Sequence, residues 1–569
     1  MSIKAISFNF LRAAMTVVLF TCVTMSAIAY DFKVNNIYYN INDDENTVSV
    51  TYKDTNYHCY SGSITIPSTV TYNGKTYTVT TIGYHAMGIC ELTSVTIPNT
   101  VTTIDNYAFF NSYKLTSITI PKSVTHIGDH VFRACFGLTT MKVADENPVY
   151  DSRDACNAII ETATNTIISG CKTTVIPNSV YGIGNNAFAG HSLTSFTLPK
   201  QITFVGEGAI ACHLIESISV AAGNTKYDSR QNCNAIIEKS TNTLIAGCKK
   251  TVIPNTVTAI GAYSFWDCDG LKSITIPSSV TSIGRNSFYC SGLTSIVIPN
   301  SVKTIGNGAF FICLNLASAT IGNSVTTIGS YAFSSTKLTS ITIPNSVSYL
   351  GDWALSHNSS LQTVTLSNAL TSIELGTFHS CSSLSNITIP NSVISIGNSA
   401  FMGCTSLPSI TIPELVTSIG TSAFAGCSSM KSATLGKSVK FLSNNAFNNC
   451  NALKTVTCES IVPPVMANRN CFTTTAYTNA ELKVPMGAIS TYKATDYWYL
   501  FDKITGYGII ITGDVNGDGL VDVLDVSYII GHVLGENPYP FIIDQADLDM
   551  NGEISIEDVT KLIGMILKQ

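Results

Sequence analysis

The chain repeats one pattern of apolar and polar positions along most of its length. In the copy that runs from Leu115 to Gly137, apolar residues stand at Leu115, Ile118 and Ile120 and are followed by Pro121. A Val, an Ile-Gly pair, an aromatic residue and a Cys come later in the copy. Ile118 and Ile120 are two residues apart, so they share one face of a strand. One strand cannot bury that face, and neighbouring copies must therefore stack into a parallel sheet.

The pattern occurs about seventeen times, with unit starts from Ser61 to Leu453 that are mostly 22 or 23 residues apart. This period and the L-x-x-I-x-I opening are typical of leucine-rich repeats. The Pro that often follows the strand ends it, because Pro has no amide hydrogen to donate. A Phe recurs at one later position and indicates a stacked aromatic core. We predict a β-rich leucine-rich-repeat solenoid with a parallel sheet of about 17 stacked units over residues 61–478.

Residues 1–29 have the features of a secretory signal peptide. Lys4 and Arg12 precede an apolar stretch too short to span a bilayer, and Ala27-Ile28-Ala29 offers a small-x-small cleavage site. A lipoprotein signal that uses Cys22 is the alternative, which the bulky residues before that Cys disfavour. No other segment is apolar for long enough to cross a membrane. We therefore expect a secreted or extracellular protein that is associated with a cell surface.

The segments that flank the repeats are expected to be caps. Residues 30–60 contain two alternating stretches, IYYNI and TVSVTY, which predict strands that cover the first coil. Residues 479–512 contain the strand pattern ELKVP and several aromatic residues, which should close the last coil. Terminal units of a solenoid need such caps because the core is otherwise open. Residues 513–569 form a separate tail.

Charge separates the repeats from this tail. Charged residues make up 12% of the chain, about half of what a typical soluble domain carries. Residues 513–569 hold eleven acids and two lysines, a net of −9, which leaves +3 for residues 1–512. The repeats lack the Lys/Arg clusters that binding to a nucleic acid backbone needs. Nucleic acid is therefore not an expected partner.

Sixteen of the 18 Cys of the chain fall into three groups. Ten lie near the ends of their units and are expected to be buried, unpaired thiols: Cys90, Cys135, Cys212, Cys268, Cys290, Cys313, Cys381, Cys404, Cys427 and Cys450. Two longer units contain near-copies, residues 150–171 and 227–248, that predict β-hairpins. In each hairpin two alternatives remain: disulfides join Cys156 to Cys171 and Cys233 to Cys248, or Cys171 and Cys248 replace the leading core Leu and stay reduced. Cys458 and Cys471 are a further candidate pair.

The tail contains two loops in which oxygen-bearing side chains have the spacing of calcium ligands, with Gly519 and Gly552 at the sharp turn. Leu520 and Glu553 would each contribute a backbone carbonyl. Each loop runs into an apolar-periodic segment that predicts a helix. We predict that the loops bind two Ca²⁺ ions through twelve residues: Asp514, Asn516, Asp518, Leu520, Asp522, Asp525, Asp547, Asp549, Asn551, Glu553, Ser555 and Asp558.

The repeat phrase L-T-S-I-T-I-P-x-S-V-T-x-I-G-x-x-A-F-x-x-C, with its YDSR-x-x-CNAIIE inserts, resembles the BspA-like leucine-rich repeat surface proteins over residues 31–512. The resemblance implies a secreted or surface-displayed protein that binds host matrix proteins, other cells or glycans. It specifies the fold much more closely than the ligand, because the exposed Thr and Ser positions vary little.

The paired loop-helix units of residues 513–569 resemble a type I-like dockerin module, a small all-α calcium-binding domain. The resemblance implies that the tail folds on calcium and docks onto a cohesin-bearing protein of an extracellular complex. Loop positions 10 and 11 differ between the copies, Val523-Leu524 in one and Ile556-Glu557 in the other. This difference speaks against a symmetric, two-way docking mode.

Three classes of function remain open. The leading one is a non-enzymatic adhesion or ligand-binding protein displayed through its dockerin. The second is a structural spacer in such an assembly, and the third is an enzymatic component of polysaccharide degradation machinery. A glycosidase needs two carboxylates about 5 to 10 Å apart, and the repeats place no acids in recurring pairs on the sheet face. A G-x-S-x-G motif and a Cys/His nucleophile pair are also missing, so we expect no catalytic residues.

Overall fold

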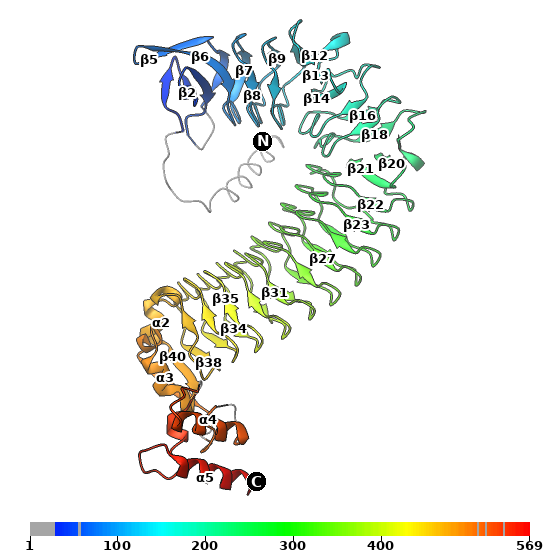
Figure 1. Cartoon of the computed structure of the whole chain (residues 1–569). Helices are drawn as coiled ribbons and strands as arrows, with labels where there is room; N and C mark the ends of the chain where they lie inside the picture. Colours follow the sequence, from blue (N-terminus) through cyan, green and yellow to red (C-terminus); the bar gives the residue numbers. More distant parts are fainter. Residues whose placement is uncertain (1–28, 55–58, 509–510, 518–519, 539–540, 569) are drawn as a thin grey trace. The chain divides into compact units, whose positions relative to one another are not determined.

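The computed structural model of the chain describes residues 29–54, 59–508, 511–517, 520–538 and 541–568. The predicted signal peptide, apart from its last residue, and Cys22 lie outside these residues, as does Asp518. The residue contacts divide the chain into two units, Met1–Leu316 and Ala317–Gln569. In both units the chain winds into coils that stack as a β-solenoid (Figure 1). The predicted fold class is confirmed.

The first row of strands comes from the L-x-x-I-x-I segment of each unit. In the pair β9–β11, Ile118 lies beside Met141 and Ile120 beside Val143 in parallel register. Ile118 and Ile120 are buried, and Ser117 and Thr119 are exposed, because successive side chains of a strand point to opposite faces. The row consists of β4 (Ser61–Thr65), β7 (Glu91–Thr96), β9 (Ser117–Ile120), β11 (Thr140–Val143), β16 (Ser195–Leu198), β18 (Ser217–Val220), β24 (Ser295–Val297), β26 (Ser318–Thr320), β28 (Ser340–Thr342), β30 (Thr363–Thr365), β32 (Asn386–Ile387), β34 (Ser409–Ile412), β36 (Ser432–Leu435) and β38 (Thr455–Cys458).

A second row of short parallel strands lies at the T-x-I-G segment of each unit, which the sequence interpretation did not treat as a strand. In the pair β23–β25, Ile283 lies beside Ile305. The row consists of β6 (Lys75–Ile82), β8 (Thr103–Ile104), β10 (His126–Ile127), β15 (Gly182–Ile183), β17 (Phe204–Val205), β22 (Ala259–Ile260), β23 (Ser282–Ile283), β25 (Thr304–Ile305), β27 (Thr327–Ile328), β29 (Tyr349–Leu350), β31 (Ser372–Ile373), β33 (Ser395–Ile396), β35 (Ser418–Ile419), β37 (Phe441–Leu442) and β39 (Val465–Met466).

The terminal segments extend the stack, so that the described residues make about 19 turns, two more than the sequence predicted. At the N-terminal end, β1 (Phe32–Val34), β2 (Ile37–Ile41) and β3 (Thr47–Thr51) pair antiparallel, and β3 joins β6 in parallel. The strand β5 (Thr69–Tyr72) pairs antiparallel with β6.

The C-terminal end is closed by aromatic side chains and short helices. Strands β40 (Glu481–Pro485) and β41 (Lys503–Tyr507) continue the first row in parallel after β38. Trp498 and Tyr492 are fully buried, and the Trp498 indole Nε1–H donates to the carbonyl of Pro464 over 2.7 Å. The helical segments of this end are η3 (Arg469–Cys471), α2 (Thr474–Asn479), η4 (Met486–Ala488), α3 (Ile489–Ala494) and η5 (Trp498–Leu500).

The recurring Phe residues form a stacked aromatic core, as predicted. The ring centroids of Phe378 and Phe401 are 5.1 Å apart, and those of Phe401 and Phe424 are also 5.1 Å apart with nearly parallel planes. The stack continues through Phe447 to Phe472 in the C-terminal end. All five rings are buried.

The described Cys residues are free, and those of the repeats are almost all buried, as predicted. Eight of the ten repeat Cys stand three residues after the core position that Phe usually occupies. Cys212 and Cys290 are the exceptions, because each stands one residue earlier, and Ser291 fills the shared position in the unit of Cys290. His191 occupies the same position in its unit. We call this site the ladder position.

Each longer unit contains the predicted hairpin. In the first, β13 (Ala158–Glu161) and β14 (Thr166–Gly170) pair antiparallel, and β12 (Tyr150–Asp151) adds a third strand. The near-copy consists of β19 (Tyr227–Asp228), β20 (Ala235–Glu238) and β21 (Thr243–Gly247). The short helices η1 (Arg153–Ala155) and η2 (Arg230–Asn232) precede β13 and β20.

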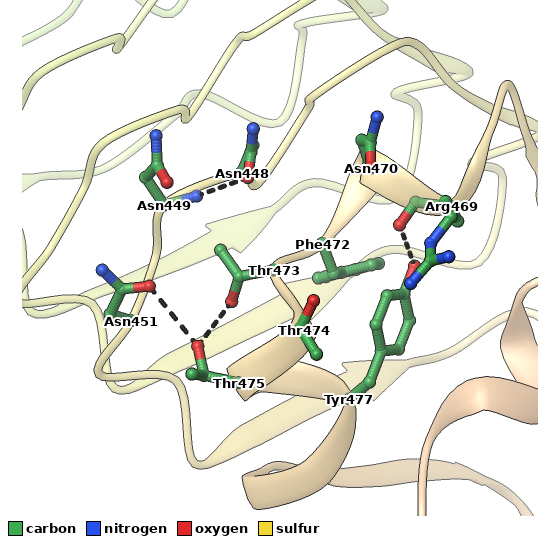
Figure 2. Close-up of a pocket in the computed structure, with 10 residues that line it drawn as sticks. All are labelled: Asn448, Asn449, Asn451, Arg469, Asn470, Phe472, Thr473, Thr474, Thr475 and Tyr477. Atoms are coloured by element: carbon green, nitrogen blue, oxygen red, sulfur yellow. Dashed lines mark hydrogen bonds between the residues drawn. The ribbon is translucent and has the colours of Figure 1, made fainter.

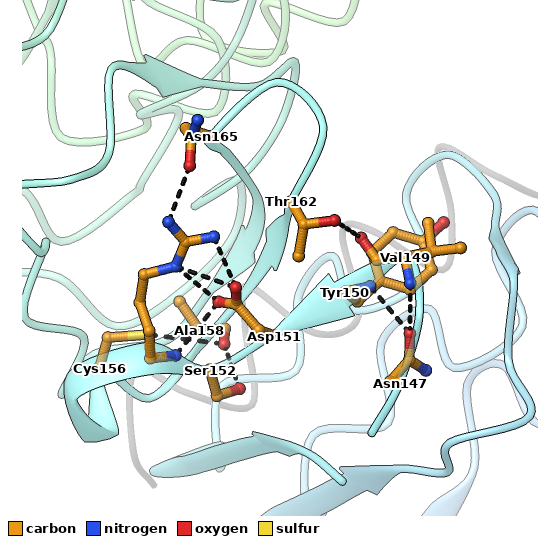
Figure 3. A network of polar contacts seen from close by, with 10 residues as sticks. Asn147, Val149, Tyr150, Asp151, Ser152, Cys156, Ala158, Thr162 and Asn165 are labelled. Carbon is orange, nitrogen blue, oxygen red and sulfur yellow. Dashed lines mark hydrogen bonds and ion pairs between the residues drawn. The ribbon is translucent and has the colours of Figure 1, made fainter. Parts of the chain in front are cut away.

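In each hairpin unit one Arg forms an ion pair with an Asp just before it and a hydrogen bond with an Asn of the hairpin turn. The Arg153 guanidinium donates to both carboxylate oxygens of Asp151, and its Nη1–H donates to the Asn165 side chain over 2.7 Å (Figure 3). Arg230, Asp228 and Asn242 repeat the arrangement in the second hairpin. The polar residues of the YDSR motif are therefore explained by the local fold.

The predicted disulfides of the hairpins are wrong, and the alternative with reduced thiols is correct. A register shift between Ile159 and Ile160 moves Cys156 away from Cys171, so that the carbonyl of Cys156 accepts from the amide of Val175 instead. Cys156 and Cys171 are both fully buried but belong to different core clusters. The second hairpin has the same shift, between Ile236 and Ile237.

Cys458 and Cys471 are also unpaired. The thiol of Cys471 contacts the carbonyl of Ser443 at 3.3 Å, while Cys458 is buried in β38. The candidate disulfide between them is therefore wrong.

The two hairpin units lack the I-G-x-x-A-F turn. On the side of the stack where the other units carry this turn, coils that are far apart in sequence therefore meet. The amide of Ala134 donates to the carbonyl of Ala189 over 3.3 Å. Arg133 forms an ion pair with Asp267 at 2.8 Å, and its guanidinium carbon lies 3.9 Å from the centre of the Trp266 ring. Trp266 in turn packs in one cluster with two small residues, Ala189 among them.

The tail contains two helices, α4 (Val523–Val533) and α5 (Ile556–Ile566), with a short η6 (Ile543–Gln545) between them. Val526 and Ile529 of α4 share a buried cluster with Val559 and Leu562 of α5, as their apolar spacing predicted. No helix in the described part of the chain is both long and apolar enough to cross a membrane.

Candidate metal-binding module

The second loop of the tail brings three of its predicted ligands together. Carboxylate oxygens of Asp547, Asp549 and Asp558 lie within 4.8 Å of one another. The Asp547 side chain accepts from the backbone amides of Asn551 (3.1 Å) and Gly552 (2.9 Å), which folds the loop around it. Gly552 has a φ of 88°, a left-handed conformation that suits Gly at the sharp turn. The loop is thus closed by its own acids.

Asp558 is both a predicted ligand and the anchor of the helix that follows. Its Oδ1 accepts from the amides of Leu548 (2.7 Å) and Asp549 (3.2 Å), and its Oδ2 accepts from that of Ser555 (2.9 Å). Burial by itself raises the pKa of Asp558, but these backbone donors outweigh burial and hold the pKa below its usual value. The carboxylate is therefore kept ionised. Ser555 caps α5, since its hydroxyl accepts from the amide of Glu557.

The first loop repeats this arrangement. Asp525 is fully buried, and its Oδ1 accepts from the amides of Val515 (2.9 Å) and Asn516 (3.1 Å). Its Oδ2 accepts from the amide of Asp522 (2.9 Å), whose own side chain caps α4. Asp514 is also largely buried. The sequence interpretation assigned Asp522, Asp525, Ser555 and Asp558 as ligands and missed their second role as helix caps, although the spacing of a capping box was present.

The remaining predicted ligands are placed as follows. The Asn551 side-chain oxygen accepts from the amide of Glu553 within the second loop. Leu520 is largely exposed and follows directly on Asp518, which lies outside the described residues. The donor set of carboxylates, amide oxygens and backbone carbonyls consists of hard oxygen ligands, which suit Ca²⁺. The residues present therefore fit this ion.

Both the repeats and the tail of the chain match known protein families. The BspA type leucine-rich repeat region matches residues 31–153, 160–243, 235–362 and 356–479, in six copies. The chain therefore belongs to the BspA-type leucine-rich repeat family. A dockerin type I domain matches residues 512–567. Dockerin type I domains are generally calcium-binding, and such a domain implies a cohesin partner.

Several crystal structures are similar to this chain. A leucine-rich repeat protein from Bacteroides ovatus is 28% identical, with 75% of this chain and 94% of that chain covered and a TM-score of 0.36. A leucine-rich cell surface protein from Faecalibacterium prausnitzii is 25% identical, with 72% and 95% covered and a TM-score of 0.29. A leucine-rich repeat protein from Eubacterium ventriosum is 19% identical, with 73% and 93% covered and a TM-score of 0.38. No curated protein matches the chain.

Proposed function

We propose that this protein is a non-enzymatic adhesion or ligand-binding solenoid, held in an extracellular, cell-surface complex by a calcium-dependent dockerin–cohesin interaction. The observation that carries this proposal is the dockerin domain at residues 512–567, which follows directly on a capped leucine-rich repeat solenoid. Proteins of these two kinds are typically extracellular or displayed at the cell surface. Host matrix proteins, other cells and glycans are the candidate ligands of the repeats.

Two calcium ions would be held by the two loops of the tail. In each loop the Asp at the last ligand position accepts hydrogen bonds from backbone amides at the beginning of the loop and at the helix cap. Eleven acids in 57 residues repel one another, and bound cations would offset this repulsion. Calcium would therefore stabilise the loops and the packing of α4 on α5.

The cohesin would dock on the exposed apolar side chains of the two helices. Val523 and Leu524 of α4 are 71% and 57% exposed, and Ile556 of α5 is 61% exposed. Such side chains at the start of each helix are costly in water unless a partner covers them. Because Glu557 of α5 stands where Leu524 stands in α4, the two helices would present different surfaces. One docking orientation would therefore be preferred.

The proposal is tested on the full chain with the double variant Asp514→Ala, Asp547→Ala. We expect calorimetry to show loss of calcium binding, and pull-down by cohesin modules from the same organism to fail, while the β-type circular dichroism of the repeats persists. Asp544→Ala is the control, because it removes one acid of the tail that lies outside both loops.

Two results would contradict the proposal. A tail that is equally protected from hydrogen exchange in chelator and in millimolar calcium would refute the metal requirement. A calcium-ordered tail that captures no cohesin would refute the docking role. A chain that docks but binds no matrix protein, cell or glycan would be a spacer in the assembly.

A further inference from the structure

A polar pocket of about 460 Å³ lies where the last repeats meet the C-terminal end (Figure 2). Two segments line it, one around Asn449 and Asn451 and the other from Arg469 to Tyr477. They belong to neighbouring coils, since Phe447 stacks on Phe472 with ring centroids 5.2 Å apart. The sequence interpretation missed this site, whose one signal is the density of Asn in the two segments.

The framework of the pocket is held by hydrogen bonds and by the aromatic core. The hydroxyls of Thr473 and Thr475 are 2.9 Å apart, and that of Thr475 also donates to the Asn451 side chain (Figure 2). On the other side, the Tyr477 hydroxyl donates to the carbonyl of Arg469 over 2.9 Å. The floor is Phe472, which is 1% exposed. The pocket is therefore formed before any ligand arrives, which lowers the entropic cost of binding.

Several polar groups of the pocket are unused by the protein. Among the described residues, the side-chain amides of Asn449 and Asn470 and the hydroxyl of Thr474 make no hydrogen bond. The Arg469 guanidinium forms no ion pair with any described residue, and no acid lines the pocket. The site thus offers one free cation and several neutral donors and acceptors.

This combination matches one class of ligand. Side-chain amides and hydroxyls can pair with the ring hydroxyls of a sugar, because each can donate and accept. A guanidinium binds a carboxylate or sulfate with two parallel hydrogen bonds. Phe472 and Tyr477 are 1% and 6% exposed, so neither offers a ring face on which a nucleotide base could stack.

We propose that this pocket binds an anionic sugar, with Arg469 on its carboxylate or sulfate and the Asn and Thr side chains on its hydroxyls. The inference rests on the proposed ligand-binding role of the repeats and assigns that role a ligand class and a location. It does not depend on the tail, because every lining residue belongs to the segment 448–477.

The test measures binding of the full chain to three polysaccharide fragments of similar length by calorimetry. Oligogalacturonate carries carboxylates, a chondroitin sulfate fragment carries both carboxylates and sulfates, and a neutral galactan fragment carries neither. We expect saturable binding of at least one anionic fragment, and Arg469→Ala should weaken it about tenfold or more, as expected for a lost charge-assisted pair. Comparison of the two anionic fragments separates a carboxylate ligand from a sulfate ligand.

Lys440→Ala is the matched control, since it removes an exposed cation that directly precedes β37 and lies outside the pocket. It should leave binding unchanged. Asn470→Ala should weaken binding of the same fragment by a smaller factor. Arg469 is exposed and forms no ion pair with described residues, so its variant should melt at the wild-type temperature.

Three outcomes would overturn the assignment: no saturable binding of either anionic fragment, equal binding by Arg469→Ala and the wild type, or binding of an acidic peptide such as oligoglutamate in place of the sugars. Cohesin capture is measured on the same preparations. If capture succeeds and sugar binding fails, the pocket assignment is wrong and the docking role stands. If both fail, the proposed function is wrong as well.

Discussion

The thiol of Cys404 donates a hydrogen bond to the backbone carbonyl of Phe378, which lies 26 residues earlier in the preceding coil, over 3.2 Å. The same contact joins Cys427 to Phe401 (3.3 Å) and Cys450 to Phe424 (3.1 Å). Where the ladder position is Ser112 or Asn358, an O–H or N–H donor contacts a carbonyl of the preceding coil in the same way. The position thus requires a buried donor and not merely a small apolar residue.

This requirement predicts different effects for two substitutions of Cys404. Cys404→Ser keeps a donor and should change the free energy of unfolding little. Cys404→Val fills the space but removes the thiol donor, and the carbonyl of Phe378 keeps only its bond from the amide of Cys381. The lost hydrogen bond should cost about 0.5–1.5 kcal/mol. Denaturant titration of both variants checks this. Equal stability of the two variants would mean that the thiol acts only by packing.

The aromatic core predicts a local loss of stability in Phe401→Ala. The fully buried ring contacts both Phe378 and Phe424, and its loss should cost about 3–5 kcal/mol. Hydrogen exchange should show increased opening in the coils on either side of Phe401 before more distant coils change. Met402→Ala is the control, because Met402 is 38% exposed and should have little effect. Unchanged exchange near Phe401 would contradict the core assignment.

The burial of His191 predicts that the stability of the part Met1–Leu316 depends on pH. Burial lowers its pKa to about 4 from the ordinary value of 6.5. Between pH 6.5 and pH 4 the unfolded chain therefore binds a proton that the folded chain does not, and stability falls as the pH is lowered through this range. The loss that His191 contributes approaches about 3 kcal/mol near pH 4 and is absent above pH 6.5.

The variant His191→Cys restores the commonest residue of the ladder position and should remove this contribution. Hydrogen exchange of the coil that contains Phe188, followed from pH 7.5 to pH 4.5, measures it locally. His126→Gln is the control, because His126 is exposed. The same pH slope in wild type and His191→Cys would show that His191 is not the group responsible.

Features set by short-range spacing could be predicted from the sequence. The alternation of Ile118 and Ile120 gave the first strand row, because the faces of a strand follow from a period of two. The loop acids were recognisable as a set because all their contacts are local, as between Asp558 and Leu548.

Features that depend on contacts between coils could not be predicted. The register shift after Ile159, which separates Cys156 from Cys171, depends on how the hairpin joins the stack. The pocket near Arg469 forms only where two segments about 20 residues apart in sequence meet on adjacent coils. The donor role of Cys404 required the carbonyl of the preceding coil to be located. A sequence pattern identifies residues that recur, but not the atoms that they face.

The two hairpin repeats, both within the part Met1–Leu316, make the two sides of the stack unequal. Each adds a strand layer on one side of the stack, while on the other side Ala134 contacts Ala189 directly and Arg133 reaches Asp267. Unequal layer numbers on two sides of a stack must tilt its axis. Exchanging a whole hairpin unit of 33 residues, such as 138–170, with a 23-residue unit elsewhere should therefore relocate this tilt without changing the number of units. The tilt of the stack axis is thus set by a segment that can be moved from one site in the gene to another.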